Sequence, residues 1–321
     1  MNHFLSCDWG TTSLRIRLAD TDNGDIIAEE ISSEGIASTF NLWQQSGSLD
    51  SERVEFYLDI LNHHIKSLED KTGRSLSDVK VVISGMASSS IGIIEISYAS
   101  APVPVDGSGL QIVIISASDR FKHDVVIISG VRTGDDVMRG EETQLIGCIA
   151  AGQYVSNEVY IMPGTHSKHI TVKDNRIADI KTYMTGELFD LLSNQSILKN
   201  TVEAADLSLD SFKQGLKEAA SANLLHSIFK VRTNHLFDIY SKPENYSYLS
   251  GLLIGAELND LASVYADTIN LVCGNSLSSY YQIALDELFP QKNIEIVPPT
   301  LADVASVTGQ IKIAKALKIL V

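Results

Sequence analysis

Short apolar segments separated by glycine-containing turns occur twice along the chain, in the same order. The first set has strands at 4–7, 14–19 and 25–31, with turns at 8–13 and 22–24. The second set has strands at 158–162, 167–172 and 176–184, with turns at 163–166 and 174–175. Strands joined by such short turns form antiparallel meanders. The repeated order therefore predicts an internal duplication.

Apolar residues at helical spacing predict helices that follow the meanders. One helix covers 49–68, and the adjacent His63 and His64 on it are expected at surface positions. Further helices are expected from 188 through 225, at 248–265, at 276–288 and at 301–320. Buried strands are predicted at 79–84 and 125–129, an apolar strand at 268–273 and a short strand at 295–297. This mixture of strands and helices predicts an α/β fold.

The length of 321 residues favours two domains. We expect an N-terminal domain at 1–150 and a C-terminal domain at 151–321. The last helix, 301–321, is a candidate to pack back on the first domain. Together with the duplication, this division predicts two similar halves that each contribute to one site.

Three glycine turns follow predicted strands and have the chemistry of phosphate-binding loops. A glycine lets the backbone approach a bound group, and backbone N–H groups and hydroxyls can then donate to an anion. The turns contain Gly10-Thr11-Thr12, Gly164-Thr165-His166 and Gly274-Asn275-Ser276, the last at the start of a helix. Each one alone is more typical of a hairpin or a capped helix. The first two in matching context favour a site that holds the two ends of a triphosphate.

The stretch 134–147 lies between the two meanders and contains Arg139, Gly140, Glu141 and Glu142. The two glutamates fall in the first turn of a predicted helix, where negative charge interacts favourably with the helix dipole. On local evidence they are typical of an ordinary helix start. Their position between the repeats favours a functional carboxylate pair. The hydroxyl-rich loop at 85–92 likewise allows two interpretations, a contact to a polyhydroxy acid or a plain loop.

The net charge of −15 argues against nucleic acid or an anionic membrane as a partner, since both require a basic face. A triphosphate site must then be locally positive, and the candidates are Arg15, Arg17, Arg139 and Lys168, each of which is otherwise a solvated charge. Three widely spaced cysteines, Cys7, Cys148 and Cys273, fit neither a disulfide framework nor a zinc motif. Without a signal peptide or a membrane-length apolar run, we expect a cytoplasmic protein.

Five motifs together resemble the 2-dehydro-3-deoxygalactonokinases, members of the actin, sugar-kinase and heat-shock-protein ATPase superfamily. These motifs are the segments 8–12, 137–147, 162–168, 184–188 and 249–257. The resemblance runs from the first strand to the last helix. It implies a two-domain actin-like (ribonuclease H-like) fold, with duplicated mixed sheets, helices on both faces of the sheets and an ATP cleft between the domains. It also implies ATP-dependent phosphorylation of a sugar acid, assisted by Mg²⁺.

The resemblance implies roles for individual residues. Glu141 and Glu142 are the catalytic candidates, with Glu141 preferred as the base, and Asp8 and Glu141 are the metal-side carboxylates. The ATP-binding candidates are Asp8, Gly10, Thr11, Thr12, Arg15, Gly164, Thr165, His166, Lys168, Gly274, Asn275 and Ser276. The substrate-binding candidates are Met86, Ser88, Ser89, Gly92, Arg139 and Gly140.

Two departures from the expected pattern leave alternatives open. Pro163 stands where the superfamily often has an aspartate, and Ser129-Gly130 and Ile93 stand where closer relatives are expected to have proline and an aromatic residue. The first alternative is a kinase of another 2-keto-3-deoxy sugar acid, and the second is an exopolyphosphatase-like phosphohydrolase. A third is an ATP-binding regulatory or filament protein. The sequence also leaves open the substrate epimer and whether the protein is a monomer or a homodimer.

Overall fold

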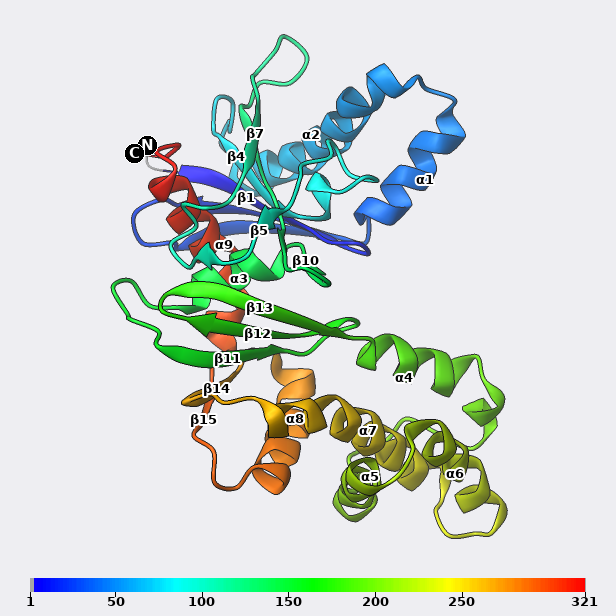
Figure 1. The fold of residues 1–321 in the computed structure, drawn as a ribbon. Coiled ribbons are helices and arrows are strands. Elements are labelled where there is room, and N and C mark those ends of the chain that lie inside the picture. The colour runs from blue at the N-terminus through cyan, green and yellow to red at the C-terminus, as the bar shows by residue number, and fades with distance from the viewer. Residues whose placement is uncertain (1–2, 321) are drawn as a thin grey trace. The chain divides into compact units, whose positions relative to one another are not determined.

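The computed structural model of the protein describes residues 3–320, apart from the side chains of Asn275 and Ser276, and these residues form two compact units. Unit 1 contains the described residues through Val155, the segment Lys173–Ile180 and the residues from Thr300 on. Unit 2 contains Ser156–Val172 and Lys181–Pro299. The chain therefore leaves unit 1 and returns to it at its C-terminal end (Figure 1).

Unit 1 is built on a six-stranded mixed sheet with the order β3-β2-β1-β4-β8-β7. Its strands are β1 (His3–Trp9), β2 (Leu14–Asp20), β3 (Ile26–Ser32), β4 (Val81–Gly85), β7 (Ile112–Ile115) and β8 (Val125–Ile128). The first three strands form the predicted antiparallel meander, whereas β4 and β8 continue the sheet in parallel with β1. As a result, the carboxyl ends of β1 and β4 lie at the same edge of the sheet.

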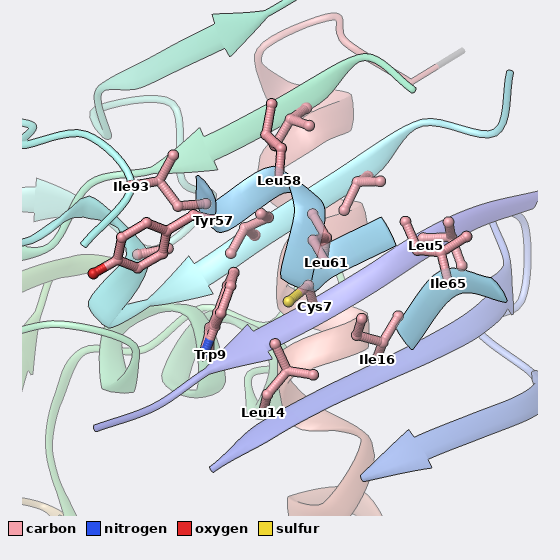
Figure 2. Close-up of a cluster of buried hydrophobic side chains, with 14 of the residues drawn as sticks. Leu5, Cys7, Trp9, Leu14, Ile16, Tyr57, Leu58, Leu61, Ile65 and Ile93 are labelled. Atoms are coloured by element: carbon pink, nitrogen blue, oxygen red, sulfur yellow. The ribbon is translucent and has the colours of Figure 1, made fainter. Parts of the chain in front are cut away.

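Helix α2 (Arg53–Thr72) covers one face of this sheet and builds the main core of unit 1. Apolar side chains alternate along β1 and β2, so that one set on each strand meets the helix. Figure 2 shows this cluster, with side chains of the strands pointing toward those of the helix: Leu5, Cys7, Trp9, Leu14, Ile16, Tyr57, Leu58, Leu61 and Ile65. The indole ring of Trp9 lies 5.8 Å from the ring of Tyr57. Because these side chains of β1 and β2 are buried, apolar residues recur along the strands, and this pattern predicts the strands from the sequence.

Helix α9 (Pro299–Ala316) and helix α3 (Glu141–Cys148) also belong to this unit, and they cross at very short range. A Cβ atom on Gly309 would lie 1.9 Å from the carbonyl oxygen of Thr143, and one on Gly147 would lie 1.9 Å from that of Ala305. The Gln310 amide on α9 donates to the carbonyl oxygen of Cys7 at 2.9 Å. The last helix therefore lies beside β1 (Figure 1) and is hydrogen-bonded to it.

The remaining elements of unit 1 are short. They are α1 (Ile36–Ser46), a small sheet made of β10 (Val137–Met138), β9 (Val131–Arg132) and β5 (Ala99–Ser100), and β6 (Val103–Pro104), which pairs with the start of β13 (Arg176–Tyr183). Helix α1 was not predicted from the sequence. The prediction for His64 is wrong, because its ring is only 4% exposed and lies 2.7 Å from the carboxylate of Glu34, whereas His63 is exposed as expected.

Unit 2 contains most of the second meander and a layer of helices, while Lys173–Ile180, the hairpin turn and the first part of β13, belongs to unit 1. The sheet has the order β15-β14-β11-β12-β13-β6, made of β11 (Asn157–Met162), β12 (Ser167–Lys173), β13, β14 (Thr268–Leu271), β15 (Ile294–Ile296) and β6. Its helices are α4 (Thr185–Asn194), α5 (Leu209–Ser221), α6 (Leu224–Leu236), α7 (Lys242–Leu258) and α8 (Asn275–Leu288). Helices α5 and α7 pack closely, since a Cβ atom on Gly251 would lie 2.1 Å from the carbonyl oxygen of Phe212. This glycine therefore allows the two helices to approach closely.

The predicted duplication is confirmed at the level of the strands, because β1-β2-β3 and β11-β12-β13 have the same order and similar turns. The first turn is shorter than predicted, since β1 extends through Asp8 and Trp9 and the turn covers only residues 10–13. The second hairpin turns at Asp174 and Asn175, both with positive φ. The three cysteines are free thiols. Within residues 3–320, no helix has both the length and the apolar character needed to cross a membrane.

Candidate functional site

The first glycine turn is tightly built and open to solvent. The Gly10 amide donates to the carbonyl oxygen of Ser13 at 2.9 Å, and the carbonyl oxygen of Gly10 accepts from the Ile36 amide at the start of α1. Gly35 is required there, because a Cβ atom would lie 2.3 Å from the carbonyl oxygen of Thr11. Thr11 and the following Thr12 are exposed. The turn is therefore fixed from behind and presents its hydroxyls outward.

Asp8 occupies the carboxyl end of β1, where three loops meet. Its Oδ2 atom accepts a hydrogen bond of 2.9 Å from the Ser306 hydroxyl on α9. Gly85, at the end of β4, has a φ of +90°, and a Cβ atom there would lie 2.7 Å from the carbonyl oxygen of Trp9. Gly140, with a φ of +111°, packs against Gly85. These two glycines bring the Asp8 strand and the glutamate helix together, and glycine alone tolerates both conformations readily.

The adjacent glutamates at the start of α3 have different environments. Glu142 is 1% exposed, and its Oε2 atom accepts from the Gly140 amide at 2.8 Å. Burial, together with the negative charge of Glu141, raises the pKa of Glu142 to about 8. Glu141 is only partly buried, and its Oε2 atom accepts from the Arg139 amide at 3.0 Å. Of the two, Glu141 is therefore the carboxylate that a bound molecule can reach.

Arg139 brings a cation to the same edge of unit 1. Its guanidinium lies 4.1 Å from the centre of the Tyr98 ring, and its Nη1 atom donates to the carbonyl and the hydroxyl oxygens of Ser88, each at 2.5 Å. Its Nε atom is buried and has no hydrogen-bond partner in the described part of the chain. A planar guanidinium held in this way suits a carboxylate ligand.

In the loop after β4, the serine hydroxyls form hydrogen bonds within the protein. The Ser89 hydroxyl donates to the carbonyl oxygen of Met86 at 2.7 Å, and Ser88 is fully buried against Arg139. Gly92 is also buried, since a Cβ atom there would lie 2.3 Å from the carbonyl oxygen of Ala87. The two serine hydroxyls therefore shape the loop, and the Arg139 guanidinium is the polar group that the loop presents.

Arg15 and Arg17, two of the cations predicted near a nucleotide, are neutralised by acids of unit 1. Arg17 is buried and pairs with the carboxylates of Glu29 at 2.6 Å and Asp303 at 2.9 Å. Arg15 lies 3.4 Å from each of the same two carboxylates. Because Asp303 lies on α9, these ion pairs hold that helix against β2.

The second glycine turn, in unit 2, is packed against the start of α4. A Cβ atom on Gly186 would lie 2.5 Å from the carbonyl oxygen of Gly164, and the Glu187 amide donates to the carbonyl oxygen of Thr165 at 3.0 Å. The ring of the exposed His166 lies 2.6 Å from the Glu187 carboxylate. On its other side, Gly164 has no described atom within 4 Å of its Cβ position. The turn is thus supported from one side and open on the other.

A cavity of about 220 Å³ in unit 2 begins at this open side. It is mostly apolar, with a few hydroxyls, which is typical of sites for flat ring systems. Its lining comes from the glycine turn, α4, α7 and α8: Gly164, Thr185, Gly186, Phe189, Tyr246, Ser250, Leu253, Ile254, Leu277, Tyr280 and Tyr281.

The predicted residues thus fall into two groups. In unit 1, Asp8, Gly140 and the two glutamates come together, with Arg139 and its loop beside them. In unit 2, the second turn lines the cavity, and Lys168 is buried, with its ammonium 3.3 Å from the carbonyl oxygen of His166. Gly274 precedes α8, one turn before the lining residue Leu277, while the side chains of Asn275 and Ser276 lie outside the described residues.

Sequence reasoning missed several residues of both groups. Ser306 gave no signal, because nothing local links a serine near the end of the chain to Asp8. Thr185 lies in the motif 184–188, and Phe189 and Tyr246 lie beside the motifs 184–188 and 249–257, so the motifs could have indicated them. Tyr280 and Tyr281 lie on α8, outside both motifs, and no local pattern links them to the cavity.

Comparison with known proteins places this geometry in a family. The family model of the 2-keto-3-deoxy-galactonokinases matches residues 8–300. The 2-dehydro-3-deoxygalactonokinase of Escherichia coli (strain K12) is 32% identical over 292 residues, which cover 89% of this chain and 90% of that protein.

Solved structures agree with this match. A crystal structure from Sinorhizobium meliloti, provisionally assigned as a 2-dehydro-3-deoxygalactonokinase, is 29% identical with a TM-score of 0.81, covering 99% of this chain and 98% of that one. Component A of the (R)-2-hydroxyglutaryl-CoA dehydratase of Acidaminococcus fermentans, 13% identical with a TM-score of 0.51 over 99% of this chain and 100% of that one, shares the fold alone. The predicted two-domain actin-like α/β fold is confirmed. The chain belongs to the 2-keto-3-deoxy-galactonokinase family.

Proposed function

We propose that this protein transfers the γ-phosphoryl group of ATP to 2-dehydro-3-deoxy-D-galactonate and forms the 6-phosphate. The observation that carries the proposal is the family match over residues 8–300, which includes both glycine turns and the glutamate helix. A relative that is 32% identical over 89% of this chain has the corresponding name. The geometry of the two residue groups supports the same reaction.

ATP has suitable partners in both groups. The apolar cavity of unit 2 fits a purine ring, and Gly164 at its edge leaves room for a phosphate beside backbone amides. In unit 1, Thr11 and Thr12 offer hydroxyls from an exposed turn. Carboxylate oxygens are the ligands that Mg²⁺ prefers, so Asp8 fits a metal that accompanies the phosphates and neutralises their charge.

The sugar acid requires a cation for its carboxylate and a base for its hydroxyl. Arg139 supplies the cation, because its side chain is only partly buried and its Nη1 atom is held in place by Ser88. Glu141 supplies the base, since it is the more accessible glutamate. It accepts the proton of the terminal hydroxyl as this oxygen attacks the γ-phosphorus, and the bond to the β-phosphate oxygen breaks to release ADP.

Glu142 is better suited to support than to proton transfer from a ligand. Its carboxyl group is bonded to the Gly140 amide and buried at the start of the helix. With its pKa raised to about 8, it is largely protonated at neutral pH and adds little charge beside Glu141. Glu141 can then carry the negative charge that a base needs.

The test is ADP release from Mg-ATP with and without 2-dehydro-3-deoxygalactonate, measured for the wild type, Glu141→Gln and Glu142→Gln. We expect release that depends on the sugar acid. We also expect a kcat lower by about 10²–10⁴ in Glu141→Gln, the usual contribution of a general base, with nucleotide affinity retained. The neighbouring Glu142→Gln is the matched control and should lose much less.

Two outcomes would overturn the proposal. ADP release that is equal without any sugar acid would indicate a phosphohydrolase. Faster turnover of the gluconate epimer than of the galactonate epimer, compared as kcat/KM under the same conditions, would assign the enzyme to a different 2-keto-3-deoxy acid.

A further inference from the structure

A buried carboxylate in unit 2 is bonded on every side and takes no part in the mechanism above. Glu257, near the end of α7, is 3% exposed. Its Oε1 atom accepts from the Ser167 hydroxyl at 2.7 Å and lies 3.0 Å from His169 Nε2. Its Oε2 atom accepts from the Thr185 hydroxyl at 2.5 Å and the Tyr281 hydroxyl at 2.8 Å. One side chain thus joins β12, α4 and α8 to α7.

The partners of Glu257 lie at the second glycine turn and the cavity of this unit, which together form the proposed nucleotide site. Ser167 is the residue directly after the second glycine turn, and Thr185 is the first residue of α4, which packs against the same turn. Thr185 and Tyr281 both line the cavity. Glu257 itself does not line it. Its hydrogen bonds therefore fix the turn on two sides and set the position of two cavity residues.

The network depends on the negative charge. A buried carboxylate is costly unless its oxygens are bonded, and here hydroxyls and an imidazole meet both oxygens. Burial raises the pKa of Glu257, but the hydrogen bond and charge of His169 and the hydroxyl donors outweigh it, so that the pKa is lowered overall. A neutral amide could not accept from all four groups at once, because its nitrogen is a donor.

We infer that Glu257 is a positioning residue for the nucleotide, because its side chain holds the second glycine turn and the lining of the cavity in a fixed position relative to each other. The inference rests on the proposed function only in taking the cavity and turn of unit 2 as the nucleotide site. It predicts that loss of the carboxylate weakens nucleotide binding selectively. The sugar-acid groups, Arg139 and Glu141, belong to unit 1, whereas Glu257 and its four partners belong to unit 2.

The experiment compares wild type, Glu257→Gln and Glu158→Gln. Glu158 is the matched control, since it lies at the other end of β11 from the turn and accepts from the Tyr160 hydroxyl at 2.9 Å and the Asn270 amide at 2.8 Å. For each protein we would measure the Kd for ADP by calorimetry and the KM values for ATP and the sugar acid. We expect both nucleotide constants to rise about tenfold in Glu257→Gln, equivalent to about 1.4 kcal/mol. The sugar-acid KM and both constants of Glu158→Gln should stay within about twofold of wild type.

A second variant keeps the test decisive if Glu257→Gln does not fold. Ser167→Ala removes one hydroxyl that does not line the cavity, and we expect its nucleotide constants to rise roughly threefold, as for a single hydrogen bond. A purely structural role would lower the melting temperature and the active fraction without changing either KM, and that result would overturn the inference. Equal losses in Glu257→Gln and Glu158→Gln would do the same. The ADP titration needs no acceptor, so it tests Glu257 even if the wild type fails to phosphorylate the sugar acid.

Discussion

At the scale of single residues, the two neighbouring glutamates show how position decides chemistry. The sequence presents Glu141 and Glu142 as an equivalent pair, and only a preference for the first could be argued by resemblance. The fold separates them, because the helix begins at Glu141 and turns Glu142 inward against the Gly140 amide. The burial of His64 has the same origin, since its partner Glu34 is remote in sequence. Such differences depend on tertiary contacts, which no local pattern encodes.

The raised pKa of Glu142 makes stability depend on pH. The pKa rises from an ordinary 4.5 to about 8, so between these values the native state holds a proton that the unfolded state releases. This contribution to stability is fully present below about pH 4.5 and is lost as the pH rises through 8. In Glu142→Gln the decline should be shallower, by at most about 1.4 kcal/mol per pH unit. Urea unfolding of the wild type and Glu142→Gln from pH 5 to 9 measures this decline in the free energy of unfolding. An equal pH dependence in the two proteins would contradict the raised pKa of Glu142.

At the scale of elements, the sequence was most informative where turn chemistry is local. The two meanders were predicted because glycine, asparagine and aspartate mark their hairpins, and the register of each strand follows from its buried face. Helix α1 was missed because its sequence, rich in hydroxyl and aromatic side chains, has no strong helical signal. Its start is fixed instead by the Ile36 and Ala37 amides, which donate to the first glycine turn. The cavity was missed because three separate helices line it.

Gly164 of the second turn and Gly186 of α4, which packs against that turn, provide a matched test at this scale. Gly164 has open space at its Cβ position and no left-handed backbone, so Gly164→Ala should change the free energy of unfolding by less than about 0.5 kcal/mol. Its methyl group would face the nucleotide, and the KM for ATP should rise about tenfold. In Gly186→Ala the methyl group would lie 2.5 Å from a carbonyl oxygen, and the protein should lose about 1–3 kcal/mol of stability.

Thermal melts and ATP kinetics on the two alanine variants separate the effects. An unchanged KM for ATP in a well-folded Gly164→Ala would show that the open side of the turn does not face the nucleotide. A Gly186→Ala protein as stable as wild type would contradict the close packing of α4 on the turn.

At the scale of the whole molecule, unit 1 is assembled from distant parts of the chain. Helix α9 supplies the Ser306 hydroxyl to Asp8, the Gln310 amide to Cys7, and Asp303 to the buried Arg17. Without α9, Asp8 and the Cys7 carbonyl would lose these hydrogen bonds, and Arg17 would keep its ion pair with Glu29 but lose the one with Asp303. The last helix therefore helps to support the first glycine turn, although almost the whole chain separates them in sequence.

A chain that ends at residue 298 should therefore lose the native structure of unit 1. Truncation exposes the face of the sheet that α9 covers and leaves the Arg17 guanidinium, 3% exposed in the intact protein, with one ion-pair partner fewer. Because Asp303 is half-exposed and Arg17 keeps its ion pair with Glu29, the lost pair itself contributes little. The larger loss is the burial of apolar residues of α9 such as Val307 and Ile313, worth about 1.5–3 kcal/mol for each side chain, together with the packing of Gly309 on α3. The total is a large part of the stability of an ordinary domain, about 5–15 kcal/mol. Hydrogen exchange should show unprotected amides in β1 and β2 but protected amides in β11 and β14, since no strand of unit 2 is removed. Adding a peptide of residues 299–321 should restore protection in β1, whereas the same peptide with Gly309→Ala should not, because its methyl group would overlap the Thr143 carbonyl. Full protection of β1 in the truncated chain would mean that the first glycine turn is stable without α9, and the support assigned to Ser306 and Gln310 would have to come from the strands alone.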